Sequence, residues 1–167
     1  MDFSKLSMGA KLALVGGAVL VINLFLPWYS FDAGPFGSVS FNAFDADILA
    51  WGGSFLAIAG AVILLLKAFG QSSVNAGQFK TEQLALLLGA AGFVLIVLRF
   101  VTETSFAGFG LWLGIAASAV VTYGAFRAMK DAGLDVPGMG GGGNRGGGGN
   151  MGGGGNMGGG GSGDPGM

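Results

Sequence analysis

Four long apolar runs, separated by short polar segments, constrain the fold of this chain more than any other feature. The runs cover residues 12–29, 48–67, 84–101 and 109–129 of the 167-residue sequence. Each holds about 18–21 residues, the length an α-helix needs to cross a hydrocarbon core near 30 Å thick. Helices are expected because the bilayer offers the backbone no water to bond. The sequence therefore predicts an all-α membrane protein, a bundle of four transmembrane helices.

The composition supports this location. Apolar residues make up 51% of the chain and charged residues 10%, whereas soluble domains carry about 25% charge. The net charge of −1 gives no means of neutralising nucleic-acid phosphates, so we expect the lipid bilayer, and no nucleic acid, as a partner. Pro27, Trp28 and Tyr29 are too bulky for a signal-peptide cleavage site, so we expect the first run to be retained.

The chain contains no Cys and no His. Without Cys, neither a disulfide framework nor a thiolate metal site can form. Without His, the commonest metal ligand and the commonest general base are both missing. We therefore expect a protein that is not an enzyme, with no catalytic residues, no metal site and no cofactor.

The basic residues predict how the chain threads the bilayer. Arg99 lies near one side of the predicted bundle, and the other basic residues fall on the opposite side: Lys5, Lys11, Lys67, Lys80, Arg127, Lys130 and Arg145. Positively charged residues favour the cytoplasmic side. The sequence thus predicts a multi-pass protein with both termini in the cytoplasm. Trp28, Tyr29, Trp51 and Trp112 would then lie near the outer interface, where aromatic rings prefer to sit.

The segment 23–47, between the first two runs, has the most distinctive composition. It carries three Asp and, after Tyr29, four Phe, but no Lys or Arg. We interpret it as an outward-facing loop that folds as a lid over one end of the bundle, with room for a short strand or hairpin. Asp45 and Asp47 are expected to cap the second helix. Whether this loop binds a lipid or a partner stays open.

A candidate polar cluster lies on the outer face, made of Asp45, Asp47, Arg99 and Glu103. Arg99 occupies the last turn of the third run, where a charge is costly unless it reaches the interface or finds a partner. It could extend toward headgroups and helix carbonyls, pair with one of the acids and hold the loop, or receive an anionic ligand. The intramembrane polar residue Asn23 is interpreted as an interhelical hydrogen-bonding group.

Small residues recur every fourth position on two of the runs: Gly53, Ala57 and Ala61 on the second, and Gly110, Gly114 and Ser118 on the fourth. This spacing keeps them on one helix face, where neighbouring backbones can approach closely. Such faces could pack within one four-helix unit, form a dimer interface or line a permeation path.

The composition changes abruptly after residue 132. Residues 133–167 are rich in Gly, Asn and Met, with a six-residue repeat of Asn, then Arg or Met, then four Gly. Such a segment has no apolar surface to bury and cannot offset the entropy lost on ordering. The sequence therefore predicts a transmembrane domain over residues 1–132 and a disordered Gly-rich tail over residues 133–167.

Several of these features resemble one group of proteins. They are the basic N-terminus, the ending Leu26-Pro27-Trp28-Tyr29 of the first run, the Asp-rich start of the second, and Gly110-Leu111-Trp112 opening the fourth. This pattern is similar to small four-span membrane proteins of actinobacteria, which often carry a low-complexity cytoplasmic tail and mostly have no assigned function. The resemblance implies a bacterial plasma-membrane location and nothing catalytic.

These observations favour a non-enzymatic scaffold or accessory subunit, with a membrane protein partner or in a homo-oligomer. The alternative is a small oligomeric transporter or channel. Small multidrug transporters also have four short spans, but the glutamate they need is absent from the first run, where Asn23 is the only strongly polar residue. No Asp, Glu or Lys lies near the middle of any run, although ion-coupled transport usually requires one.

Overall fold

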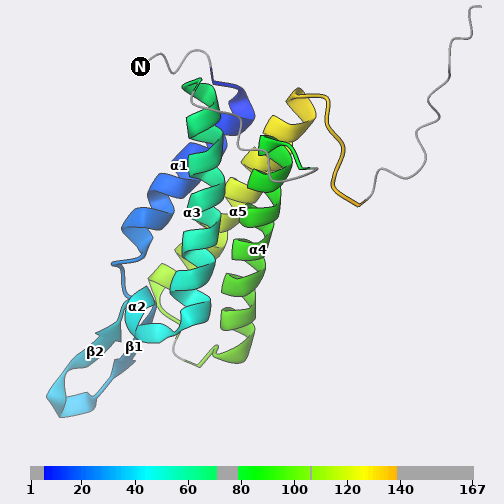
Figure 1. Ribbon diagram of the computed structural model, residues 1–167. Coiled ribbons are helices and arrows are strands. Elements are labelled where there is room, and N and C mark those ends of the chain that lie inside the picture. Colours follow the sequence, from blue (N-terminus) through cyan, green and yellow to red (C-terminus); the bar gives the residue numbers. More distant parts are fainter. Residues whose placement is uncertain (1–5, 71–78, 106, 139–167) are drawn as a thin grey trace, which may run out of the picture.

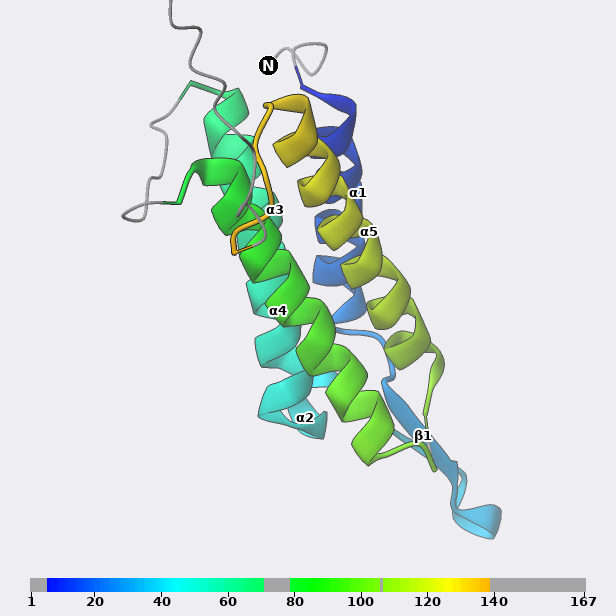
Figure 2. The ribbon, with the colours of Figure 1, turned by 90° about the vertical axis from the view of Figure 1, so that its right-hand side faces the viewer.

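A bundle of four antiparallel helices forms the body of the protein. The computed structural model describes residues 6–70, 79–105 and 107–138. Within them, the long helices lie side by side and alternate in direction (Figures 1 and 2): α1 (Met8–Asn23), α3 (Ile48–Ala68), α4 (Thr81–Thr102) and α5 (Phe109–Asp131). The predicted all-α bundle is therefore confirmed.

The segment between α1 and α3 adds a small structure at one end. The chain forms strand β1 (Tyr29–Asp32), the 3₁₀ turn η2 (Gly34–Phe36), strand β2 (Ser38–Phe41) and the one-turn helix α2 (Ala43–Ala46). The two strands pair antiparallel, with Tyr29 opposite Phe41 and Asp32 opposite Ser38. The hairpin that the sequence allowed is thus present.

In the part of the chain that the structure describes, three helices are long and apolar enough to cross a membrane, α3, α4 and α5, and α1 is a shorter apolar helix of 16 residues. The predicted first span, residues 12–29, was therefore placed wrongly. The helix begins earlier because the Ser7 hydroxyl accepts a hydrogen bond from the Ala10 N–H, 3.2 Å away, and caps it. It ends earlier because Pro27 disfavours a helical conformation at Leu26, and no helix continues past Asn23.

Helices pack most closely in two pairs, α1 with α5 and α3 with α4, and contacts of α1 with α3 and of α4 with α5 close the bundle. Glycines permit this approach. A methyl group added at Gly92 of α4 would lie 2.7 Å from the Ala57 backbone nitrogen of α3. The predicted small-residue faces are buried inside this single chain: Gly53, Ala57, Ala61, Gly110, Gly114 and Ser118.

The end of the bundle opposite the hairpin is held by polar contacts. Lys67 at the end of α3 pairs with Glu82 at the start of α4, and the Glu82 residue is only 5% exposed. After α5 the chain turns back, so that Gln83 Nε2 donates to the Asp135 carbonyl at 2.8 Å. Leu134 and Val136 pack against the core, which extends the packed region beyond the predicted boundary at 132. The rest of the predicted tail, 139–167, lies outside the described residues.

Candidate functional site

The base of the hairpin is built into the end of the bundle. Trp28 is fully buried, its indole N–H donates to the Asn23 carbonyl at 2.9 Å, and its ring lies against Gly110 and Gly114 of α5. Tyr29 is 7% exposed. Their position near the outer interface stays a prediction, but both rings pack against protein rather than face lipid. Both rings are held inward because the Pro27 and Trp28 carbonyls accept hydrogen bonds from the start of α5.

Backbone hydrogen bonds fix this base in place. The Trp28 N–H donates to the Phe41 carbonyl at 2.8 Å, so the hairpin is closed where it leaves the bundle. The Trp28 carbonyl accepts from the Gly108 N–H at 2.7 Å, and the Pro27 carbonyl accepts from the Gly110 N–H at 2.9 Å. The hairpin is thereby attached to the first turn of α5.

The hairpin itself extends away from the helices rather than folding over them (Figures 1 and 2). Phe36 at its tip is 91% exposed, and Phe31, Val39 and Phe41 are also exposed. Only its base and α2 cover the bundle, where the buried Ala43 donates its N–H to the Leu24 carbonyl at 3.3 Å. The predicted lid is therefore limited to these parts, because the strands project beyond the helix ends.

The two aspartates after the hairpin cap different helices. Asp47 Oδ1 accepts from the Ile48 N–H at 2.5 Å and so caps α3, as the sequence suggested. Asp45 instead belongs to α2, where its carboxylate accepts from the Asn42 N–H at 3.4 Å while the Asn42 side chain accepts from the Asp45 N–H. The reciprocal pair stabilises a helix of one turn, which the sequence had not resolved from α3.

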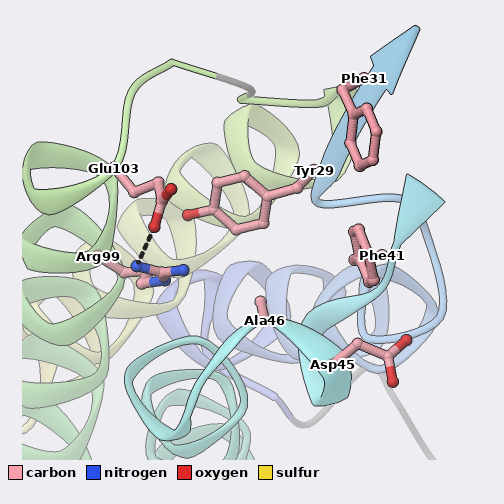
Figure 3. A pocket seen from close by; sticks show the side chains of 7 residues that line it. All are labelled: Tyr29, Phe31, Phe41, Asp45, Ala46, Arg99 and Glu103. Carbon is pink, nitrogen blue, oxygen red and sulfur yellow. Dashed lines mark hydrogen bonds and ion pairs between the residues drawn. The ribbon is translucent and has the colours of Figure 1, made fainter. Parts of the chain in front are cut away.

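A pocket of about 390 Å³ lies between the hairpin and the end of α4. Figure 3 shows its lining: Tyr29, Phe31, Phe41, Asp45, Ala46, Arg99 and Glu103. The fold thus brings together three of the four predicted cluster residues, Asp45, Arg99 and Glu103. Asp47, engaged at the α3 terminus, does not line the pocket.

Arg99 is the centre of the polar contacts in this pocket. Its Nη1 lies 3.2 Å from Glu103 Oε2, one turn further along the chain, and its guanidinium lies 5.0 Å from the Tyr29 ring centroid. The side chain is only 12% exposed, and Nε is buried without a hydrogen-bond partner. Arg99 therefore pairs with one of the predicted acids and contacts the loop through an aromatic face.

Tyr29 is the site residue that the sequence reasoning missed. Its hydroxyl points toward Arg99 and Glu103 (Figure 3) but is buried without a partner that satisfies hydrogen-bond geometry. Burial raises the pKa of this phenol above its ordinary 10.0, while the Arg99 charge opposes the rise. The phenol is thus a neutral donor at physiological pH. The sequence offered one indication that Tyr29 belongs to this site: it lies two residues before Phe31, a spacing that places both side chains on one face of a strand.

Asn23 differs from the prediction. Its side chain is fully buried, but neither amide atom has a hydrogen-bond partner. The amide nitrogen lies against Gly114 of α5, which offers no side chain to bond it. The predicted interhelical hydrogen bond is therefore absent, and the residue makes only a packing contact across the α1–α5 pair.

Among the residues that the structure describes, no group of three or more His, Cys, Asp or Glu side chains is arranged to hold a metal ion. Comparisons of the chain with protein-family models, curated proteins and solved structures found no match. Function must therefore be inferred from the geometry of the hairpin, the pocket and the bundle.

Proposed function

We propose that this protein is a non-enzymatic accessory subunit or scaffold of the bacterial plasma membrane. It would bind a partner membrane protein outside the bilayer through the β1–β2 hairpin. The observation that carries this proposal is the projection of the hairpin beyond the helix ends (Figure 1), with Phe36 91% exposed at its tip.

Physical arguments support a docking role for the hairpin. Its strands have four residues each, and a two-stranded hairpin is at best marginally stable in water. Exposed apolar groups in a cluster often mark an interaction surface, and an open strand edge can pair with an extended segment of a partner. Hydrogen bonds to the start of α5 keep the base fixed, so the tip is presented in a defined direction.

The charges support an orientation with the hairpin outside the cell. Lys67, Lys80 and Lys130 lie at or next to helix ends on the side of the bundle away from the hairpin. Positively charged residues near span ends favour the cytoplasm. The N-terminal end of α1 and the C-terminal end of α5 would then face the cytoplasm.

The transport alternative receives less support from the bundle interior. Ser54 and Ser118 are buried, but their hydroxyls donate to carbonyls of their own helices, Ala50 at 2.9 Å and Ile115 at 3.0 Å. Such local bonds use the O–H donors, so these hydroxyls have no donor left for an anion or a polar substrate.

Photo-crosslinking in cells tests the proposed function. Benzoylphenylalanine is placed at Phe36 and, as a control, at Phe69, an exposed phenylalanine at the opposite end of α3. We expect irradiation to give a discrete protein adduct from position 36 that is missing from position 69. Mass spectrometry would identify the crosslinked protein as a partner or as a second copy of this chain. The two proteins would then be purified separately and mixed to measure their binding.

In that mixture, Phe36→Asp should weaken binding by about tenfold or more, because exposed aromatic anchors often dominate an interface. Phe69→Asp should leave it unchanged. Lipid adducts alone at position 36, or equal binding by the Phe36→Asp protein, would remove the hairpin as a docking element and with it the basis of the scaffold proposal.

A further inference from the structure

The pocket between the hairpin and α4 combines unpaired donors, carboxylates and aromatic rings. We propose that it binds the zwitterionic phosphoethanolamine group, with the phosphate against Arg99 and Tyr29 and the ammonium against Asp45. This inference is independent of the protein partner, because it concerns the pocket beside the hairpin rather than its tip.

Two buried donors in the pocket lack an acceptor. Arg99 Nε has no hydrogen-bond partner, although Nη1 of the same group binds Glu103. The Tyr29 hydroxyl has none either, and Tyr29 is more than nine-tenths buried. Leaving a buried donor unpaired is costly, so both favour an incoming oxygen. A phosphate oxygen would accept charge-assisted hydrogen bonds from a guanidinium and a phenol together.

The charges in the lining argue against a simple anion. The lining holds one arginine, Arg99, beside Glu103, and a second carboxylate, Asp45, on the opposite side of the pocket (Figure 3), so a simple anion would meet a net negative lining. A simple cation would leave both donors unpaired and would meet the guanidinium. A ligand with a negative oxygen beside an ammonium matches both the donors and the carboxylate of the pocket. Asp45 is available to the ammonium, because it has no ion-pair partner among the described residues, whereas Glu103 is already paired with Arg99.

The walls and location fit such a group. Phe31 and Phe41 stack with ring centroids 6.2 Å apart, and aromatic faces attract an alkylammonium. The volume of about 390 Å³ lies within the range of small-molecule sites, roughly 300–1,000 Å³. Arg99 belongs to the last turn of α4, the level at which lipid headgroups meet a spanning helix.

Native mass spectrometry of the full-length protein in detergent tests the assignment. The protein is titrated separately with phosphatidylethanolamine, phosphatidylglycerol and phosphatidylcholine of identical acyl chains. We expect phosphatidylethanolamine to bind about tenfold more tightly than the other two, because only it supplies both a phosphate and an ammonium with hydrogen-bond donors. Equal binding of phosphatidylglycerol or phosphatidylcholine to the wild-type chain would overturn the proposal.

Three substitutions assign the two halves of the ligand. Tyr29→Phe removes only the hydroxyl, and Arg99→Gln removes the charge, so each should weaken phosphatidylethanolamine binding by about tenfold. Asp45→Asn should act in opposite directions, weakening phosphatidylethanolamine and strengthening phosphatidylglycerol, which a loss of folding cannot do. The same direction for both lipids, or a Tyr29→Phe protein that binds like wild type, would refute the assignment.

Arg127→Gln is the matched control. Arg127 Nη1 lies 3.4 Å from the Tyr123 hydroxyl on α5, so this pair resembles Arg99 and Tyr29 but is exposed and lies away from the hairpin. Loss of the Arg127 charge should leave the affinities for all three lipids unchanged.

Soluble glycerophosphoethanolamine distinguishes a lipid headgroup from a free zwitterion as the ligand. Binding as tight as that of the lipid indicates capture of a free zwitterion, whereas binding that requires acyl chains indicates a lipid site.

Discussion

At the scale of single residues, three of the described residues have buried polar atoms without hydrogen-bond partners: the Asn23 amide, the Tyr29 hydroxyl and Arg99 Nε. Two of them, Tyr29 and Arg99, line a pocket that can admit an acceptor. Asn23 is different, because it is enclosed in the α1–α5 contact beside Gly114. Its amide therefore costs stability without offering a binding surface.

Replacing this amide should stabilise the protein. Leucine has nearly the shape of asparagine but no polar atoms, so Asn23→Leu should raise the free energy of unfolding by about 1–2 kcal/mol. The measurement is equilibrium unfolding in mixed micelles. Ser54→Ala is the control, since the Ser54 hydroxyl already bonds the Ala50 carbonyl, and little gain is expected. An Asn23→Leu protein that is no more stable than wild type would contradict the description of Asn23 as an unpaired, destabilising amide.

Residue-level prediction was uneven for physical reasons. Arg99 and Glu103 could be paired from the sequence, because residues four apart on a helix are neighbours. The burial of Tyr29 could not, since an aromatic residue at the end of an apolar run is typical of an interfacial belt. Its position depends on the hydrogen bonds that Gly108 and Gly110 donate to the Trp28 and Pro27 carbonyls, which join segments distant in sequence.

At the scale of helices, glycines set the distance between α3 and α4. Adding a methyl group at Gly92 would press against the Ala57 backbone nitrogen, 2.7 Å away, and against the Gly53 carbonyl. By contrast, Gly52 of α3 lies outside this contact, and a methyl group added there would meet only the Ile48 side chain of the same helix, 3.7 Å away. The two positions therefore separate the effect of backbone clash from the effect of helix propensity.

Gly92→Ala should destabilise the bundle by about 1–3 kcal/mol or more, because overpacking moves two backbones apart. Gly52→Ala should be neutral or stabilise by up to about 1 kcal/mol, since alanine favours a helix. Thermal unfolding in detergent, followed by circular dichroism, compares the two proteins. If both substitutions had the same effect, the close approach of α3 and α4 would be wrong.

Helix positions were largely predictable, and their ends less so. α3, α4 and α5 match their apolar runs because twenty apolar residues have few other solutions in a bilayer. The predicted bounds of the first span were wrong because the hydropathy of Leu24 to Tyr29 was taken as part of the span. The cap at Ser7 and the effect of Pro27 on Leu26 decided the boundaries instead.

At the scale of the whole molecule, the orientation across the bilayer is open to a direct test. The chain has no Cys, so single cysteines report on one position each. Phe36→Cys marks the hairpin tip, and Ala132→Cys marks the exposed end of α5. With the basic helix ends in the cytoplasm, an impermeant maleimide added to intact spheroplasts should label position 36 and not position 132.

Permeabilisation should make position 132 reactive and leave labelling at 36 unchanged. The opposite pattern in intact spheroplasts would reverse the orientation, and labelling of both would show that the tip and the end of α5 share one side. Double substitution provides an internal standard, because both sites are then read in the same molecule.

The pairing of α1 with α5 has a consequence for biogenesis. The 16 residues of α1 span about 24 Å, less than a hydrocarbon core near 30 Å. Its packing partner α5 is synthesised after the other described helices, and Gly9 and Gly16 contact α5 directly. The nascent α1 is therefore short and lacks its partner α5 until nearly the whole bundle has been synthesised. The closest packing of α1 is thus completed only after α5 has been synthesised.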